Sequence, residues 1–120
     1  MYREYKLKSI PHGNCRVNII TEKGKIQRIE LQSYLTTVTV IDLDERIPVI
    51  YNTYEWKLFY NHRKEEKKPP QTTIKQIGKF TAEFLGENIY KELKKSDIYF
   101  LNIAEVKTIT AVAENYIEGR

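Results

Sequence analysis

The sequence predicts an α+β fold: a curved antiparallel β-meander of five to six strands, followed by two or three C-terminal helices packed on one face. Two observations carry this prediction. Residues 1–60 alternate between apolar and polar side chains and are rich in Thr, Tyr, Ile and Val, whereas residues 71–117 repeat their apolar positions at helical spacing. A sheet covered by helices on one side would bury the apolar faces of both in a single core.

The length of 120 residues predicts one domain, with a β-rich part at 1–60, a charged loop at 61–70 and a helical part at 71–117. No apolar run approaches the ~18 residues that span a bilayer, and the N-terminal residues are charged and lack the apolar core of a signal peptide. The single cysteine, Cys15, cannot form an internal disulfide, which fits a reducing compartment. We therefore expect a cytoplasmic protein with no membrane partner.

Six segments of the first half have the alternation or the β-branched composition of strands. Gly24 can adopt the positive φ that closes a hairpin between two of them. Pro48 restricts another to an edge or to the end of a strand, because proline donates no ladder hydrogen bond. The last segment alternates most regularly, which predicts that Trp56 is buried against the helices. The predicted strands are 4–10, 15–20, 26–31, 35–43, 47–51 and 54–60.

Helices are predicted after the charged loop, whose two final prolines can continue neither a strand ladder nor a helix. Thr72 or Thr73 is the expected N-cap of the first helix, which ends at Gly86. A second short helix is predicted at residues 87–95. Residues 98–117 have a helical apolar face but also several β-branched residues, and we favour a helix there over a strand. The apolar stripe of the first helix comprises Ile74, Ile77, Phe80, Phe84 and Leu85.

The motifs that could carry chemistry are incomplete. His12 and Cys15 supply two of the four ligands of a closed zinc site, and the five glycines are too scattered for a phosphate-binding loop. Asp42 followed by Glu55-x-Lys57 resembles the core of restriction-endonuclease-like nucleases, although the proline that usually precedes this Asp is missing. We therefore expect no catalytic residues, no metal site and no cofactor.

Aromatic and basic residues gather between positions 51 and 68. Rings beside cations can stack on unpaired bases and hold phosphates, and the same residue types dominate the energy of protein interfaces. The charged loop is longer than most connections, and we expect it to be exposed and to take part in partner recognition. The expected binding residues are Tyr54, Phe59, Tyr60, Arg63, Lys64, Lys67 and Lys68.

The charge alternates along the chain, so the total of +4 hides a pattern. Residues 1–28 hold seven bases and two acids, and residues 62–95 hold nine bases and five acids. The segments between and after them, 29–61 and 96–120, have net charges of −3 and −2. One basic face therefore exists only if the first and third segments meet in the fold.

Three short motifs resemble a known family. Residues 31–36 (LQSYLT), 38–42 (V-x-V-I-D) and 72–80 (TTIKQIGKF) resemble small uncharacterised proteins carried by phages and plasmids of Gram-positive bacteria, over about residues 29–85. The resemblance implies a mobile-element origin, a bacterial host cell and an accessory role. Accessory phage proteins of this size often occupy a host protein, as inhibitors of CRISPR nucleases do. Because the chain is basic, mimicry of DNA is disfavoured as its mechanism of inhibition.

The leading hypothesis is a non-enzymatic binding protein of a mobile element, which inhibits a host defence complex such as a CRISPR-Cas effector. Its expected partner is a host protein or a ribonucleoprotein. The alternative is a single-stranded nucleic-acid-binding protein that uses the aromatic and basic stretch. A Mg²⁺-dependent nuclease is the third hypothesis.

Overall fold

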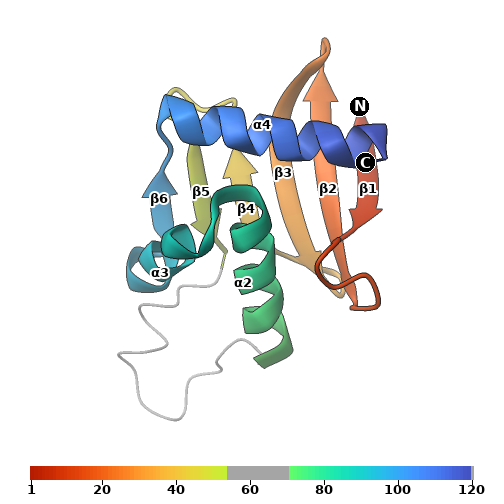
Figure 1. Ribbon diagram of the computed structural model, residues 1–120, viewed down its shortest axis with the longest axis vertical. Coiled ribbons are helices and arrows are strands. Elements are labelled where there is room, and N and C mark those ends of the chain that lie inside the picture. The colour runs from red at the N-terminus through yellow and green to blue at the C-terminus, as the bar shows by residue number, and fades with distance from the viewer. Residues whose placement is uncertain (54–70, 120) are drawn as a thin grey trace.

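The computed structural model describes residues 1–53 and 71–119, which form a six-stranded antiparallel sheet and three helices (Figure 1). The strands are β1 (Tyr2–Lys6), β2 (Cys15–Glu22), β3 (Lys25–Ser33), β4 (Thr36–Asp42), β5 (Val49–Asn52) and β6 (Ile98–Phe100). The helices are α2 (Gln71–Leu85), α3 (Glu87–Ser96) and α4 (Ile103–Glu118). No helix in the described part of the chain is long and apolar enough to cross a bilayer.

The strands follow one another across the sheet in chain order, and each is antiparallel to its neighbours. All three helices lie on the same side of the sheet, with α4 running across the strands and α2 below it (Figure 1). The predicted α+β class, with a meander covered by helices on one face, is confirmed. We call the side that carries the helices the inner face and the opposite side the outer face.

The turns follow the local chemistry of the sequence. Lys23 and Gly24 have φ values of 52° and 77°, the two positive values that a tight hairpin with the twist of its strands requires, so the predicted Gly24 hairpin is confirmed. Pro48 precedes β5, so its missing N–H removes no bond from that strand's ladder. Its carbonyl accepts a hydrogen bond from Leu101 N at 2.8 Å, which fixes the far end of β6.

Two predictions about the helical half need correction. Residues 98–100 form strand β6 rather than the start of a helix, because their backbone completes the ladder of β5. The helix predicted in the tail begins only at Ile103, where Asn102 and Glu105 form a reciprocal capping box. Helix α2 begins at Gln71, so Thr72 and Thr73 lie inside its first turn and neither is its N-cap.

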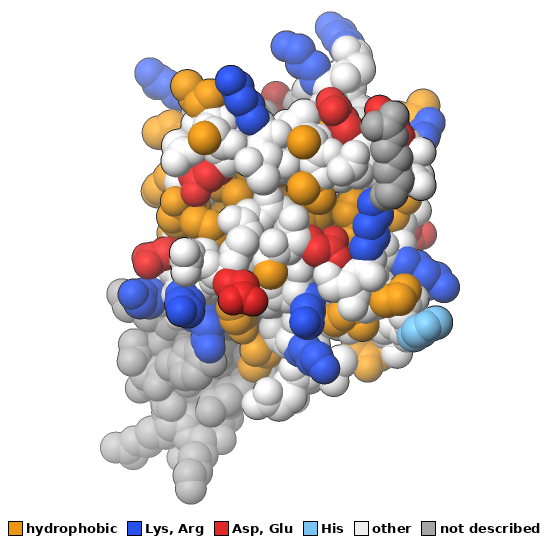
Figure 2. All heavy atoms as spheres, in the orientation of Figure 1, with side chains coloured by type: hydrophobic (Ala, Val, Ile, Leu, Met, Phe, Trp, Pro, Cys, Tyr) orange, Lys and Arg blue, Asp and Glu red, His pale blue; other side chains and the backbone are white. Residues whose placement is uncertain are grey.

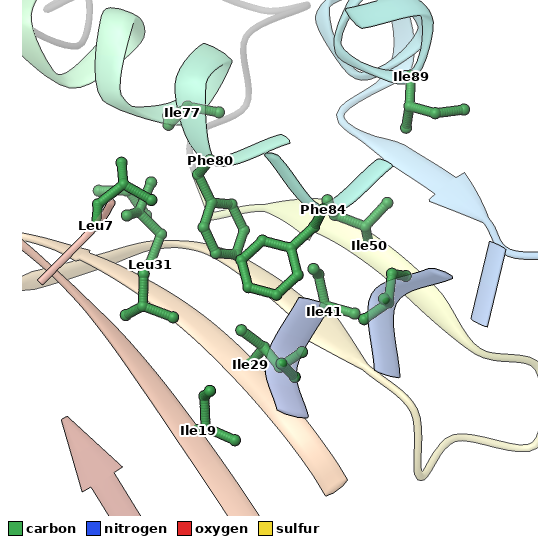
Figure 3. Close-up of a cluster of buried hydrophobic side chains, with 14 of the residues drawn as sticks. Leu7, Ile19, Ile29, Leu31, Ile41, Ile50, Ile77, Phe80, Phe84 and Ile89 are labelled. Atoms are coloured by element: carbon green, nitrogen blue, oxygen red, sulfur yellow. The ribbon is translucent and has the colours of Figure 1, made fainter. Parts of the chain in front are cut away.

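The core lies between the inner face and the stripe of α2, as the helical spacing predicts. Phe80 and Phe84 are fully buried, with ring centroids 4.9 Å apart, and point from α2 onto Ile29 and Ile41 of the sheet (Figure 3). The ring of Tyr116, from α4, stacks on Phe84 at 5.7 Å with an interplanar angle of 4°. Deleting one of these side chains would leave a cavity, which costs about 3–5 kcal/mol for an aromatic residue.

A small buried polar cluster joins α2 to the sheet. Ser33 Oγ donates to Gln76 Oε1 at 2.6 Å and lies 3.1 Å from Thr73 Oγ1, and all three residues are buried. Ser33 belongs to the LQSYLT motif and the other two belong to the TTIKQIGKF motif. The two motifs therefore meet in space, and their polar residues satisfy one another inside the core.

Candidate functional site

The seven residues predicted to bind a partner lie outside the described part of the chain, as do the predicted strand 54–60, the loop 61–70 and Trp56. These predictions therefore stay predictions. Of the nuclease-like pattern, only Asp42 is described; its Oδ1 accepts a hydrogen bond from Asp44 N at 3.0 Å, which makes a local turn. Among residues 1–53 and 71–119, no three His, Cys, Asp or Glu side chains are placed to share a metal ion.

Cys15 is a core residue in this structure. Its side chain is fully buried on the inner face, and burial raises the pKa of the thiol above its ordinary value. A raised pKa leaves less of the nucleophilic thiolate at neutral pH. Neither burial nor pKa therefore favours a reactive cysteine.

A polar cluster with a perturbed tyrosine connects the β1–β2 loop to two helices. Tyr116 Oη donates to Glu83 Oε2 at 2.5 Å and accepts from Lys8 N at 3.0 Å, and the other oxygen of Glu83 accepts from the backbone N–H and the hydroxyl of Ser9. Burial and the bond to Glu83 raise the pKa of Tyr116 well above its usual range. Every one of these contacts holds elements of this chain together, so the cluster is a structural clamp.

The outer face is polar across β1, β2 and β3. Cross-strand pairing places Glu4, Arg16 and Gln32 there, and Arg16 Nε lies 3.9 Å from Glu4 Oε1. Arg28 lies 3.2 Å from Glu30, and Asn18, which is only 1% exposed, donates to Gln32 Oε1 at 3.1 Å. We call this region the polar half of the outer face. Several of its charged and amide groups contact one another, as Arg16 does with Glu4 and Asn18 with Gln32.

The outer face is largely apolar across β4, β5 and β6, with Asp42 opposite Val49 as a charged exception. The register pairs Val40 with Tyr51, Tyr51 with Ile98, and Val49 with Phe100, and alternation from the buried Ile41 and Ile50 directs these side chains outward. Val40 and Val49 are buried, whereas Ile98 is 42% exposed and Phe100 is 59% exposed. We call this region the apolar half. Its exposed part lies on the edge strand.

Two further exposed apolar side chains lie beside this strand. The hydrogen bond between Leu101 N and Pro48 O brings Ile47, which precedes Pro48, and Ile103, two residues after Leu101, to the same end of β6. Ile103 is 77% exposed and Ile47 is 57% exposed. Single exposed apolar residues are ordinary, but several gathered around one edge strand are typical of an interaction site. We call Ile47, Ile98, Phe100 and Ile103 the apolar edge.

Local structure positions the apolar edge. Asp97 adopts a left-handed conformation with φ of 62°, which ends α3 and turns the chain into β6, and Ser96 Oγ donates to Ile98 O at 2.7 Å. The capping box at Asn102 then starts α4 immediately after the strand. The helical spacing of residues 98–117 predicts that Ile98 lies on a helix, so this site does not follow from the sequence pattern. The signal was the short run Ile98-Tyr99-Phe100, placed between a helix end and an Asn cap.

The β3–β4 hairpin presents a second apolar feature. Tyr34 has a φ of 55°, an uncommon conformation for a bulky residue, and its N–H donates to Asn14 O at 2.7 Å. Leu35 follows at the tip and is 93% exposed. Backbone strain of this kind costs about 1–3 kcal/mol and is enriched at functional sites. This tip is smaller than the apolar edge, since only Tyr34 and Leu35 contribute.

Comparison with known proteins adds no relative. No protein-family model, no curated protein and no solved structure matches this chain.

Proposed function

We propose that this protein is a non-enzymatic binding protein of a phage or other mobile element, which occupies a host protein through its apolar edge. The observation that carries the proposal is the exposed pair Ile98 and Phe100 on an edge strand, flanked by Ile47 and Ile103. Aromatic side chains anchor many protein interfaces because they bury a large apolar area with few rotatable bonds. Clustered exposure of this kind is best explained by a partner that covers it.

The backbone of β6 supports the same proposal. Asn52 N donates to Asp97 O at 2.9 Å and Leu101 N donates to Pro48 O at 2.8 Å, so alternate residues of this strand face β5. By alternation, the N–H groups of Ile98 and Phe100 point away from the sheet. An extended segment of a partner could pair with them, with the two exposed side chains giving specificity.

The class of target follows from the resemblance of the sequence to small phage and plasmid proteins. We propose a host defence complex, such as a CRISPR-Cas effector, as the protein that is occupied. Blocking a protein surface suits an apolar edge, whereas mimicry of DNA would call for an acidic surface. The alternative function is binding of single-stranded nucleic acid through residues 51–68. Of the aromatic residues in this stretch, the structure describes Tyr51, whose side chain is half-buried.

The test compares two substitutions of matched exposure. Phe100→Ser removes an aromatic side chain that is 59% exposed on the apolar edge, and Tyr2→Ser removes one that is 57% exposed on the opposite edge strand. The parent is expected to inhibit target cleavage by a purified Cas effector from a Gram-positive host. Phe100→Ser should lose the inhibition, and Tyr2→Ser should keep it.

The same assay separates the target class from the binding surface. Inhibition that survives Phe100→Ser and Ile98→Ser together would contradict the apolar edge as the contact. If the parent inhibits no defence effector, the proposed defence target is wrong. Copurification from host lysate then tests the apolar edge, and the binding of each captured protein to both variants is measured. Cleavage of DNA or RNA by the purified protein with Mg²⁺ would contradict the proposal that the protein is not an enzyme.

A further inference from the structure

Helices α2 and α3 form a sharp corner on the helix side of the molecule. A single residue, Gly86, connects them with φ of 95° and ψ of 163°, a conformation that is accessible essentially only to glycine. Within this corner Tyr90 of α3 packs directly against α2 at Gly78, where a Cβ atom would lie 3.3 Å from the tyrosine ring. A residue without a side chain at position 78 thus allows the two helices to approach.

A groove of about 400 Å³ runs between the two helices. Its lining includes the apolar residues Ile74 and Ala82 and four lysines, two from each helix. In Figure 2, separate groups of blue basic side chains lie near the centre and at the lower left, over α2 and α3, with polar, apolar and acidic side chains between them. The four groove lysines are Lys75, Lys79, Lys91 and Lys94.

Among residues 1–53 and 71–119, the positive charge of this groove is only partly offset by carboxylates. No carboxylate of the described residues lies within 4.0 Å of the ammonium groups of these four lysines. Two of the three acids on α2 and α3 are engaged elsewhere, since Glu83 binds Tyr116 and Ser9, and Glu92 lies 3.8 Å from Lys95. Glu87 is the acid that lines the groove, which leaves a local charge of about +3.

We propose that this groove binds the phosphate backbone of single-stranded nucleic acid. A groove with cations on both walls can follow one flexible strand, and the lysines lie one turn apart on each helix, so that successive phosphates meet successive cations. This site does not use the residues of the apolar edge. It is therefore independent of the proposed protein contact, and either surface can fail without the other.

In the described part of the chain, the two basic segments of the sequence meet at the margin of this site. Ser9, Ile10 and Gly13 of the first segment line a second hollow together with Lys75 and Lys79. Most bases of residues 1–28 lie on the strands and hairpins of the sheet instead. The groove therefore depends on the charges of α2 and α3 and not on the net charge of the whole chain.

The test uses two variants of equal net charge. One replaces the four groove lysines by glutamine, and the control replaces four exposed lysines elsewhere, Lys6, Lys23, Lys25 and Lys107. Binding of a fluorescein-labelled oligouridine is measured by anisotropy across a salt series, after thermal denaturation has shown that both variants are folded. The affinity of the parent should fall log-linearly as the salt concentration rises. The groove variant should reduce the slope of log affinity against log salt concentration by about 3, which is about 0.7 for each of four phosphate contacts.

Three results would overturn the proposal. The first is that the parent does not bind the oligonucleotide. The second is that the two variants lose affinity equally, which would mean that binding depends only on net charge. Competition by poly-glutamate as effective as competition by unlabelled oligouridine would show that the groove selects anions in general and not nucleic acid. If the control variant keeps the salt dependence of the parent and the groove variant loses it, the result supports the site.

Discussion

The two halves of the outer face belong to one sheet but meet water in different ways. On β1–β3, charged side chains pair with one another, across strands in the case of Arg16 and Glu4 and within β3 in the case of Arg28 and Glu30. On β4–β6, most of the corresponding positions are valine, tyrosine, isoleucine or phenylalanine, and Asp42, opposite Val49, is a charged exception. Edge strands are usually protected from association by charges, and β1 has this protection whereas β6 lacks it. The difference shows which edge is suited to a partner.

The largest effect is expected where the inner and outer faces are compared on one strand. Ile50 is fully buried on the inner face and its neighbour Tyr51 lies half-buried on the outer face. Ile50→Ala should lower the free energy of unfolding by about 2–5 kcal/mol, because it removes buried carbon and leaves a cavity. Tyr51→Ala should cost clearly less, and urea denaturation measures both. Equal losses would show that the outer face of β5 is packed as tightly as the core.

An intermediate effect is expected at alkaline pH, at the clamp that holds α4. Tyr116 has a raised pKa when folded and titrates near its ordinary value of 10.0 when unfolded. Stability from this group is therefore complete below pH 10 and falls as pH rises above it, by about 1.4 kcal/mol per pH unit, because only the unfolded chain releases the proton. Tyr116→Phe should make the decline less steep in urea denaturation between neutral and alkaline pH. An unchanged slope would contradict this assignment.

The smallest effect on stability is expected when an aromatic and a basic side chain are exchanged between the two edge strands, β6 and β1. This exchange is also the most direct test of the comparison. Phe100→Lys should leave the free energy of unfolding within about 1 kcal/mol, because the side chain is 59% exposed. It should also lower the binding of a fluorescent hydrophobic dye and any self-association seen by light scattering. Lys6→Phe on β1 should raise both signals. If the exchange leaves dye binding unchanged, the apolar edge is not an accessible surface.

The sequence by itself determined the fold class and most of its elements. Alternation specified the strands through the two-residue period of side chains, and the stripe of Ile77, Phe80 and Phe84 specified the helix that covers them. These signals are local, since they depend on residues a few positions apart. Gly24 is a further example, because the conformation of a tight hairpin is decided by the residues within it.

The tertiary structure alone decided where the candidate surfaces lie. Residues 98–100 become a strand because β5 offers an unpaired edge, an interaction between segments about 50 positions apart that no local period reveals. The same is true of the lysine groove, whose walls come from two helices and whose width depends on Tyr90 resting against Gly78. Charge and apolar character can be counted along a chain, but a surface exists only after the fold has brought distant residues together and buried the others.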